Sequence, residues 1–145
     1  MEVLNKLRKQ SKKIQYGVYK RCANTKNLDF ELSFEEYESV VNQKCYYCNE
    51  TEEKGFNGID RNDQTKGYTI DNCLPCCTMC NYIKGSLHSS GFIKRIEHIL
   101  THQGRIQGEY HAEYFADHKG CSYSGYKKRA ETKQLDFQLT QDEFL

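Results

Sequence analysis

The fold is decided by the stretch Cys45-Tyr-Tyr-Cys48, followed by Gly58-Ile-Asp-Arg61 and then by Cys77-Thr-Met-Cys80-Asn81. Two Cys-x-x-Cys pairs supply the four thiolates that a tetrahedral structural zinc ion requires. We therefore expect the four cysteines of these two pairs to bind zinc. The insert between the pairs is polar and punctuated by glycine, so it has room for a second site.

Length and composition favour small zinc-organised modules over one large core. The chain has 145 residues, a formal net charge of +1 and 37% hydrophobic residues, a lower fraction than in an ordinary globular domain. No apolar run approaches the ~20 residues of a membrane span, and the N-terminus carries no apolar signal segment. We therefore expect a soluble, intracellular protein whose cysteines are metal ligands or buried thiols and not disulfides.

The first 28 residues form a basic arm. They contain eight lysines and arginines against one acidic residue, whereas residues 29–38 are acidic. A local positive charge of this size suits a polyanion such as nucleic acid. The alternative is a lysine-rich helix face that is merely solvated. The nucleic-acid contacts expected on the arm are Lys12, Lys13, Lys20, Arg21 and Lys26.

The arm is repeated near the end of the chain. Residues 19–32 align without gaps with residues 126–139, at a constant offset of 107. Each copy predicts a basic helix, a short extended segment and a new helix that begins at Ser33 or Thr140 with a Ser/Thr-x-x-Glu capping box. The second copy stops before any counterpart of the first cysteine pair, so we expect a truncated second arm.

The region of the cysteine pairs predicts a ββα unit. We expect strands at residues 57–62 and 68–71, joined by a turn at residues 63–67, and then a helix at residues 78–87. Pro75 is expected in the link between the second strand and the helix, where no ladder hydrogen bond is lost. Because the unit has little apolar surface, bound zinc would supply on the order of 10 kcal/mol of folding free energy.

These motifs resemble those of the HNH nucleases. The resemblance covers residues 16–87 and includes Gly58-Ile-Asp-Arg61, Asp71-Asn72 and Cys80-Asn-Tyr-Ile-Lys84. It points to the subgroup with two zinc knuckles that is common in phages and large viruses. The resemblance implies an α+β protein, namely a small zinc-stabilised ββα-metal (HNH) module with flanking helices that hydrolyses phosphodiester bonds of DNA.

The same resemblance implies roles for individual residues. Asp60 and Asn81 would hold one catalytic divalent ion, Mg²⁺ or Mn²⁺, against the scissile phosphate, since carboxylate and carbonyl oxygens are hard ligands. Asn72 would brace the loop by hydrogen bonds, and Lys84 would face the nucleic-acid backbone.

A second cysteine pair, Cys73-Leu-Pro-Cys76, competes for the zinc ion. We prefer Cys77 and Cys80, because a ligand pair at the start of the helix would present Asn81 beside the metal site, as in the HNH family. The other cysteines are then expected to bind no metal, with Cys73 and Cys76 buried and with Cys22 and Cys121 as unpaired thiols.

Arg61 leaves the mechanism open. HNH nucleases place a histidine base directly after the strand aspartate, and a guanidinium cannot accept a proton. One alternative is a metal-dependent endonuclease in which Arg61 holds the phosphate and another group takes the proton. The groups considered for the proton are Asp63, Tyr68, His88 and a phosphate oxygen of the substrate. The second alternative is a catalytically degenerate zinc module that binds DNA without cutting it, and the third is a structural zinc module that contacts protein.

The expected domain organisation has four parts. A basic helical arm spans residues 1–40, with the first repeat copy at 16–37, and the zinc-knuckle HNH module with its following helix spans residues 41–103. A connector at residues 104–122 leads to the truncated second copy of the arm at residues 123–145.

Overall fold

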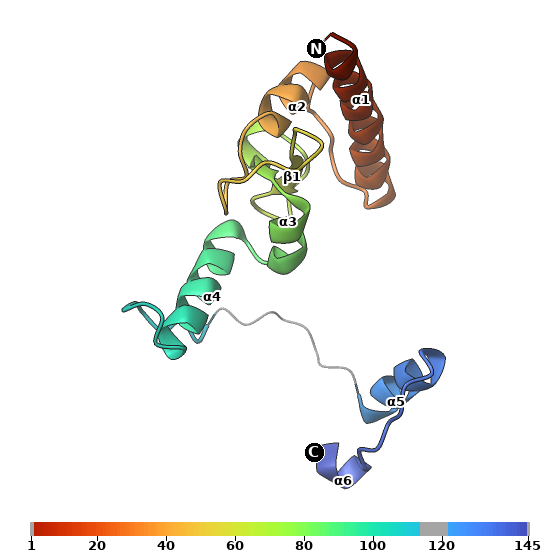
Figure 1. Ribbon diagram of the computed structural model, residues 1–145, viewed down its shortest axis with the longest axis vertical. Coiled ribbons are helices and arrows are strands. Elements are labelled where there is room, and N and C mark those ends of the chain that lie inside the picture. The colour runs from red at the N-terminus through yellow and green to blue at the C-terminus, as the bar shows by residue number, and fades with distance from the viewer. Residues whose placement is uncertain (1, 114–121, 145) are drawn as a thin grey trace. The chain divides into compact units, whose positions relative to one another are not determined.

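The computed structural model describes residues 2–113 and 122–144 (Figure 1). The chain divides into two compact units, residues 1–115 and residues 116–145. Cys121, which the sequence predicts to be an unpaired thiol, lies outside the described residues. In the part of the chain that is described, no helix has both the length and the apolar character needed to cross a membrane.

The first unit combines several helices with one small hairpin. Its elements in chain order are α1 (Glu2–Thr25), α2 (Phe34–Val41), β1 (Gly58–Arg61), the 3-10 helix η1 (Ile70–Asn72), β2 (Cys73–Cys76), α3 (Thr78–Lys84) and α4 (Ser89–His102). The second unit contains α5 (Tyr123–Thr132) and α6 (Gln141–Phe144). This combination of helices with a two-stranded antiparallel sheet confirms the predicted α+β class.

The hairpin and the following helix form the predicted ββα unit. Strands β1 and β2 pair antiparallel, with Gly58 opposite Cys76 and Arg61 opposite Cys73. Helix α3 begins directly after the hairpin, with Cys77 as its N-cap. The chain therefore leaves the sheet straight into the helix that carries the second cysteine pair.

The predicted position of the second strand is wrong. Tyr68 forms an isolated bridge with Phe30 of the arm, residues 70–72 form η1, and the strand follows at Cys73–Cys76. Pro75 therefore lies inside β2, opposite Ile59, and not in the link to the helix. Both strands of a two-stranded sheet are edge strands, with no neighbouring strand on their outer side. The strand therefore tolerates proline, which has no N–H to donate. Alternating apolar residues indicate an extended chain but do not indicate which segment it pairs with.

The basic arm is part of the core of this unit. Helix α1 runs beside α2 in Figure 1, and the two helices contact each other. Tyr19 of α1 reaches β1, where its hydroxyl oxygen accepts a hydrogen bond from the backbone N–H of Ile59 at 3.0 Å. Gly58 leaves space for this contact, because a Cβ there would lie 2.6 Å from the Tyr19 oxygen. The buried cluster comprises Ala23, Leu32, Tyr37, Val40, Val41, Phe56, Ile59, Tyr68 and Cys73.

Both predicted capping boxes are confirmed. At the start of α2, Ser33 Oγ accepts from the N–H of Glu36 at 3.2 Å, and the Glu36 carboxylate accepts from the N–H of Ser33 at 2.8 Å. Thr140 and Glu143 make the corresponding bonds at the start of α6, at 3.3 and 2.9 Å. Each box satisfies backbone donors that a helix start leaves without intrahelical partners.

The first part of the expected connector returns along α4. His111 Nε2 lies 2.7 Å from a carboxylate oxygen of Glu97, and the backbone N–H of His111 donates to Nδ1 of His98 at 2.9 Å. These contacts attach residues 104–113 to the helix that follows the zinc module.

Candidate functional site

Four cysteine sulfurs converge beside the hairpin. The Sγ atoms of Cys45, Cys48, Cys77 and Cys80 all lie within 4.8 Å of one another, and those of Cys48 and Cys77 are 3.7 Å apart. A tetrahedral zinc–thiolate site with Zn–S bonds of about 2.3 Å has S···S edges of about 3.8 Å. The cluster therefore fits a zinc ion, and it contains the same four residues that the sequence predicts.

The competing cysteine pair is not part of this cluster. Cys73 lies in the apolar core, where burial raises the pKa of its thiol to about 12. Cys76 is buried as well, and its thiol donates to the carbonyl of Cys77 at 3.3 Å. Burial also opposes ionisation of Cys45, but hydrogen bonds from backbone N–H groups around its sulfur outweigh it and lower the pKa to about 6. The positions of the sulfurs, and not these pKa shifts, separate the two pairs, because burial also raises the pKa of Cys80 within the cluster.

A second, smaller site lies where β1, α3 and α1 meet. Asp60 of β1 and Asn81 of α3 line one pocket of about 200 Å³. Tyr19 and Lys26 of the basic arm line it too. The structure thus brings the two expected metal ligands together and adds a lysine from a segment that precedes them by more than 30 residues.

Asp60 lies inside a buried network. Lys84 Nζ is 3.1 Å from its Oδ1, and both side chains are almost fully buried, with exposed fractions of 0% for Lys84 and 1% for Asp60. Tyr47 donates its hydroxyl to Oδ2 at 2.7 Å, and Gln64 Nε2 lies 3.3 Å from Oδ1. Burial and the bond to the Asp60 carboxylate raise the pKa of Tyr47, so its hydroxyl stays protonated and holds the carboxylate as a donor.

Lys84 is therefore not located where the resemblance to HNH nucleases would place it. Its ammonium points into the protein and also donates to the carbonyl of Arg61 at 3.2 Å. A fully buried ammonium requires an anionic partner, and Asp60 supplies it.

Arg61 is bonded within its own loop. Its guanidinium donates to the carbonyls of Gln64 and Lys66, at 2.8 and 2.7 Å, and to the side-chain oxygen of Gln64 at 2.8 Å. Its Cζ also lies 5.2 Å from the ring centroid of Tyr68. These contacts hold the chain that leaves β1 and direct the guanidinium toward residues 64–66.

Asn72 closes the same loop from the other side. Its amide group donates to the carbonyls of Asp63 and Gly67, at 3.0 and 2.9 Å, and its side-chain oxygen accepts from the N–H of Asp63 at 2.9 Å. The loop at residues 63–67 is thus held by Asn72 and Arg61 together.

The groups considered as proton acceptors lie in different places. Tyr68 lines the pocket of Asp60 and Asn81. The Asp63 carboxylate accepts from the hydroxyl and the N–H of Thr65, and these bonds lower its pKa. His88 is the N-cap of α4, where its Nδ1 accepts from the N–H of Ser90.

The expected nucleic-acid contacts on the arm divide into two groups. Lys12 is buried and forms an ion pair with Glu38 at 3.1 Å, and Lys13 lies over the ring of Phe34 at 5.9 Å. Lys13, Lys20, Arg21 and Lys26 are exposed, and of these Lys26 lines the pocket. The exposed group therefore carries the positive charge that a polyanion would meet.

The sequence did not predict that Tyr47 and Gln64 contact Asp60. Tyr47 stands within the first cysteine pair, and spacing alone does not show that its ring crosses from the zinc cluster to β1. Gln64 lies in a predicted turn, where a polar side chain usually faces the solvent.

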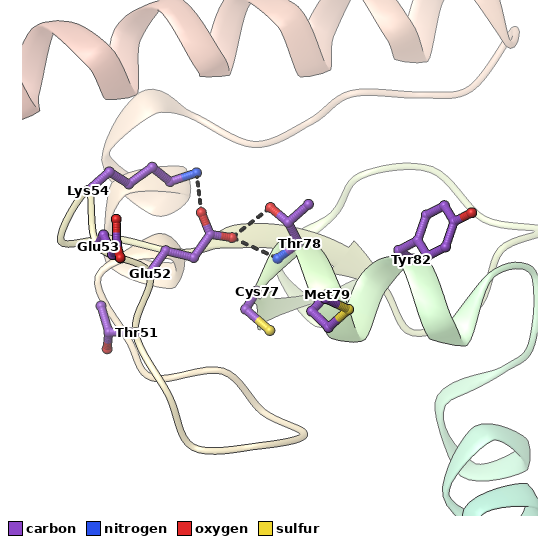
Figure 2. A pocket seen from close by; sticks show the side chains of 8 residues that line it. All are labelled: Thr51, Glu52, Glu53, Lys54, Cys77, Thr78, Met79 and Tyr82. Carbon is purple, nitrogen blue, oxygen red and sulfur yellow. Dashed lines mark hydrogen bonds and ion pairs between the residues drawn. The ribbon is translucent and has the colours of Figure 1, made fainter.

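A larger pocket of about 950 Å³ opens on the other side of Cys77 (Figure 2). Met79 and Tyr82 project from α3 beside it, and Glu52 accepts from both the N–H and the hydroxyl of Thr78 at 2.7 Å. Glu52 also pairs with Lys54 at 2.7 Å. The carboxylate of Glu52 therefore caps the start of α3, which carries the second cysteine pair.

Comparison with known proteins gives a viral relative and a nuclease with a similar chain path. No family model matches the chain. The chain is 37% identical over 130 residues to uncharacterized protein R423 of Acanthamoeba polyphaga mimivirus, a match that covers 90% of this chain and 24% of that protein. The chain thus spans about a quarter of the length of this relative. Among solved structures it is similar to the HNH restriction endonuclease PacI, with a TM-score of 0.48 and 20% identity over 65% of this chain and 80% of that chain.

Proposed function

We propose that the protein is a metal-dependent endonuclease of HNH type that hydrolyses phosphodiester bonds of DNA. The observation that carries the proposal is that Asp60 and Asn81, from β1 and α3, line one pocket beside the zinc cluster. Their carboxylate and amide oxygens are the donors that Mg²⁺ or Mn²⁺ prefers. When bound, a divalent ion offsets the negative charge that builds on the phosphate and on the leaving oxygen.

The residues around the pocket have separate tasks in this proposal. Tyr47 and Lys84 fix the orientation of the Asp60 carboxylate through its two oxygens. Lys26 lines the pocket from the exposed surface of the arm, where its ammonium is suited to a DNA phosphate. Arg61, with its guanidinium bonded to residues 64–66, shapes the loop beside the pocket.

Asn81→Ala is expected to abolish nicking of supercoiled plasmid in Mg²⁺ or Mn²⁺, with a loss on the order of 10²-fold or more. Asn81 is only half-buried, so the substitution should leave the fold intact. Tyr82→Ala, one residue further along α3 and 85% exposed, is the matched control and should cut like the parent. Asp60→Ala should also lose activity, and its zinc content shows whether the module survives. Parental cutting by a zinc-loaded Asn81→Ala or Asp60→Ala protein would remove that residue from the metal site.

One observation favours a second function, DNA binding without cleavage. An ammonium already occupies the position next to Oδ1 of Asp60, so a divalent ion binding there has to share the carboxylate with Lys84 or displace it. If the pair persists on DNA, the module would bind the duplex through its basic arm alone. A protein that shifts plasmid mobility in a salt-sensitive way but never nicks it would support this function over the first.

The exposed group on the arm is expected to set the salt dependence of DNA binding. Replacing Lys20, Arg21 and Lys26 together by alanine should make the plot of log affinity against log salt shallower. The magnitude of its negative slope should fall by up to about 3, because each lost phosphate contact removes about 0.9. Lys12→Met should leave the slope unchanged, since Lys12 is buried against Glu38. Fluorescence anisotropy over a salt series measures both slopes, and equal slopes for the triple variant and the parent would exclude these three residues as DNA contacts.

A further inference from the structure

The second unit repeats the fold of the first arm at the level of single hydrogen bonds. Tyr123 donates its hydroxyl to the carbonyl of Leu139 at 3.0 Å, as Tyr16 does to Leu32 at 2.7 Å. The N–H of Leu135 donates to the carbonyl of Ala130 at 2.9 Å, and Leu28 donates to Ala23 at the same distance. The residue that ends the helix turn has a positive φ in both copies, 52° at Asn27 and 54° at Gln134. Both segments therefore present the same face, formed by the helix and the extended segment after it.

In the first arm this face is covered by the hairpin module. Tyr68 exchanges backbone hydrogen bonds with the extended segment, donating to Asp29 at 2.8 Å and accepting from Glu31 at 3.0 Å. Tyr19 accepts from the N–H of Ile59. Leu32 is only 3% exposed as a result. The surface of the module that receives the arm is formed by β1 and by Gly67–Tyr68.

In the second arm, described by itself, the same face lies open. Leu139, the counterpart of Leu32, is 51% exposed, and Tyr126, the counterpart of Tyr19, is 45% exposed. Leu135 is 62% exposed. These side chains are large and apolar, and exposing several of them together on a small unit is unfavourable unless a partner covers them.

The residues of the docking face are shared by the two arms. Unchanged between the copies are Tyr19 and Tyr126, Ala23 and Ala130, Leu28 and Leu135, Asp29 and Asp136, Phe30 and Phe137, and Leu32 and Leu139. Exposed positions of α1 are changed in part, as at Cys22 and Asn24, which correspond to Arg129 and Glu131, and kept in part, as at Lys20 and Thr25. The second arm has thus kept these docking-face residues, whereas its exposed face has changed in part.

We propose that the second arm, residues 123–144, is a docking element for a ββα zinc module of the same build as residues 45–85. The partner is recognised by a strand of the Gly-Ile-Asp-Arg type, which offers a backbone N–H to Tyr126, and by a Gly-Tyr segment that pairs with residues 136–138. Docking would also bring Lys133, the counterpart of Lys26, to the pocket of that partner. The proposal does not depend on whether the protein cuts DNA.

A full-length chimera tests the fit. Residues 16–37 are replaced, without any change in length, by a second copy of residues 123–144. We expect this chain to keep its zinc and to melt within about 10 °C of the parent. The same chimera with the transplanted Ala130 changed to Asp should melt more than about 10 °C below the unsubstituted chimera, because a carboxylate would then be buried against the hairpin. A chimera that fails to bind zinc, or that tolerates the aspartate, would overturn the proposal.

Association in trans is tested with full-length chains. The acceptor carries Ala23→Asp to free its module and Ala130→Asp to disable its own second arm; the donor is the parent protein. Sedimentation velocity should show a one-to-one complex that disappears when the donor carries Ala130→Asp. If a zinc-loaded acceptor binds neither donor, or binds both equally, the second arm is not a docking element. If the acceptor does not fold, zinc content and melting of the chimera are the test of the proposal.

Discussion

Cys80→Ser is expected to release zinc and to unfold the ββα module. The sulfur of Cys80 is one of four that lie within 4.8 Å of one another, and three sulfurs leave a structural zinc site incomplete. Zinc binding in small modules contributes on the order of 10 kcal/mol to folding. Metal analysis after gel filtration and near-UV circular dichroism should show loss of metal together with loss of tertiary structure.

Cys76→Ser is the matched control, because Cys76 lies in the same strand-to-helix segment but outside the cluster. It should retain zinc in full. Its buried thiol becomes a hydroxyl that still reaches the carbonyl of Cys77, so we expect a loss of stability of about 1–3 kcal/mol. The opposite pattern, with zinc lost from Cys76→Ser and kept by Cys80→Ser, would show that the ligand pair is Cys73 and Cys76.

Lys84→Met is expected to destabilise the module by about 3–5 kcal/mol. The substitution removes the ammonium but leaves the Asp60 carboxylate in a site with almost no solvent access, and an unpartnered buried charge costs this much. Tyr47 and Gln64 would still donate to the carboxylate, which sets the loss toward the lower end of the range. Urea unfolding of the zinc-loaded protein measures the difference.

A double variant separates the charge from the packing. Lys84→Met with Asp60→Asn removes both charges, so it should recover most of the lost stability. Lys54→Met provides a surface comparison, because the Lys54–Glu52 pair is partly exposed and should contribute no more than about 1 kcal/mol. A Lys84→Met protein as stable as the parent would mean that Asp60 is not charged in the folded state.

The parts of the fold that were predictable depend on short spacings. Two residues separate the cysteines of each pair, two also separate the serine or threonine of each capping box from its glutamate, and the copies of the arm align without gaps. Each cysteine pair and each capping box lies within about one turn of chain, so its local geometry can be predicted from the spacing alone. The second strand was misplaced because its partner is chosen by residues far away, including the arm segment that bridges to Tyr68.

The candidate site divides in the same way. The residue types at Asp60, Asn72 and Asn81 could be identified from motif positions, but the contacts of the charged residues could not. A lysine in a sequence is most often solvated, and the basic arm gave no sign that Lys12 would be buried against Glu38. A phosphate contact by Arg61 was only one of the alternatives from the sequence, and its hydrogen bonds to the carbonyls of residues 64 and 66 could not be read from it.

The sequence by itself therefore determined the four cysteines of the cluster, the ββα order, the helix starts and the two arms. Only the tertiary structure decided that Lys84 neutralises Asp60, that the arm closes the core of the module and that the second arm leaves the matching face open. The physical reason is that ligand spacing and capping are local, whereas burial and charge pairing depend on segments that meet only after folding.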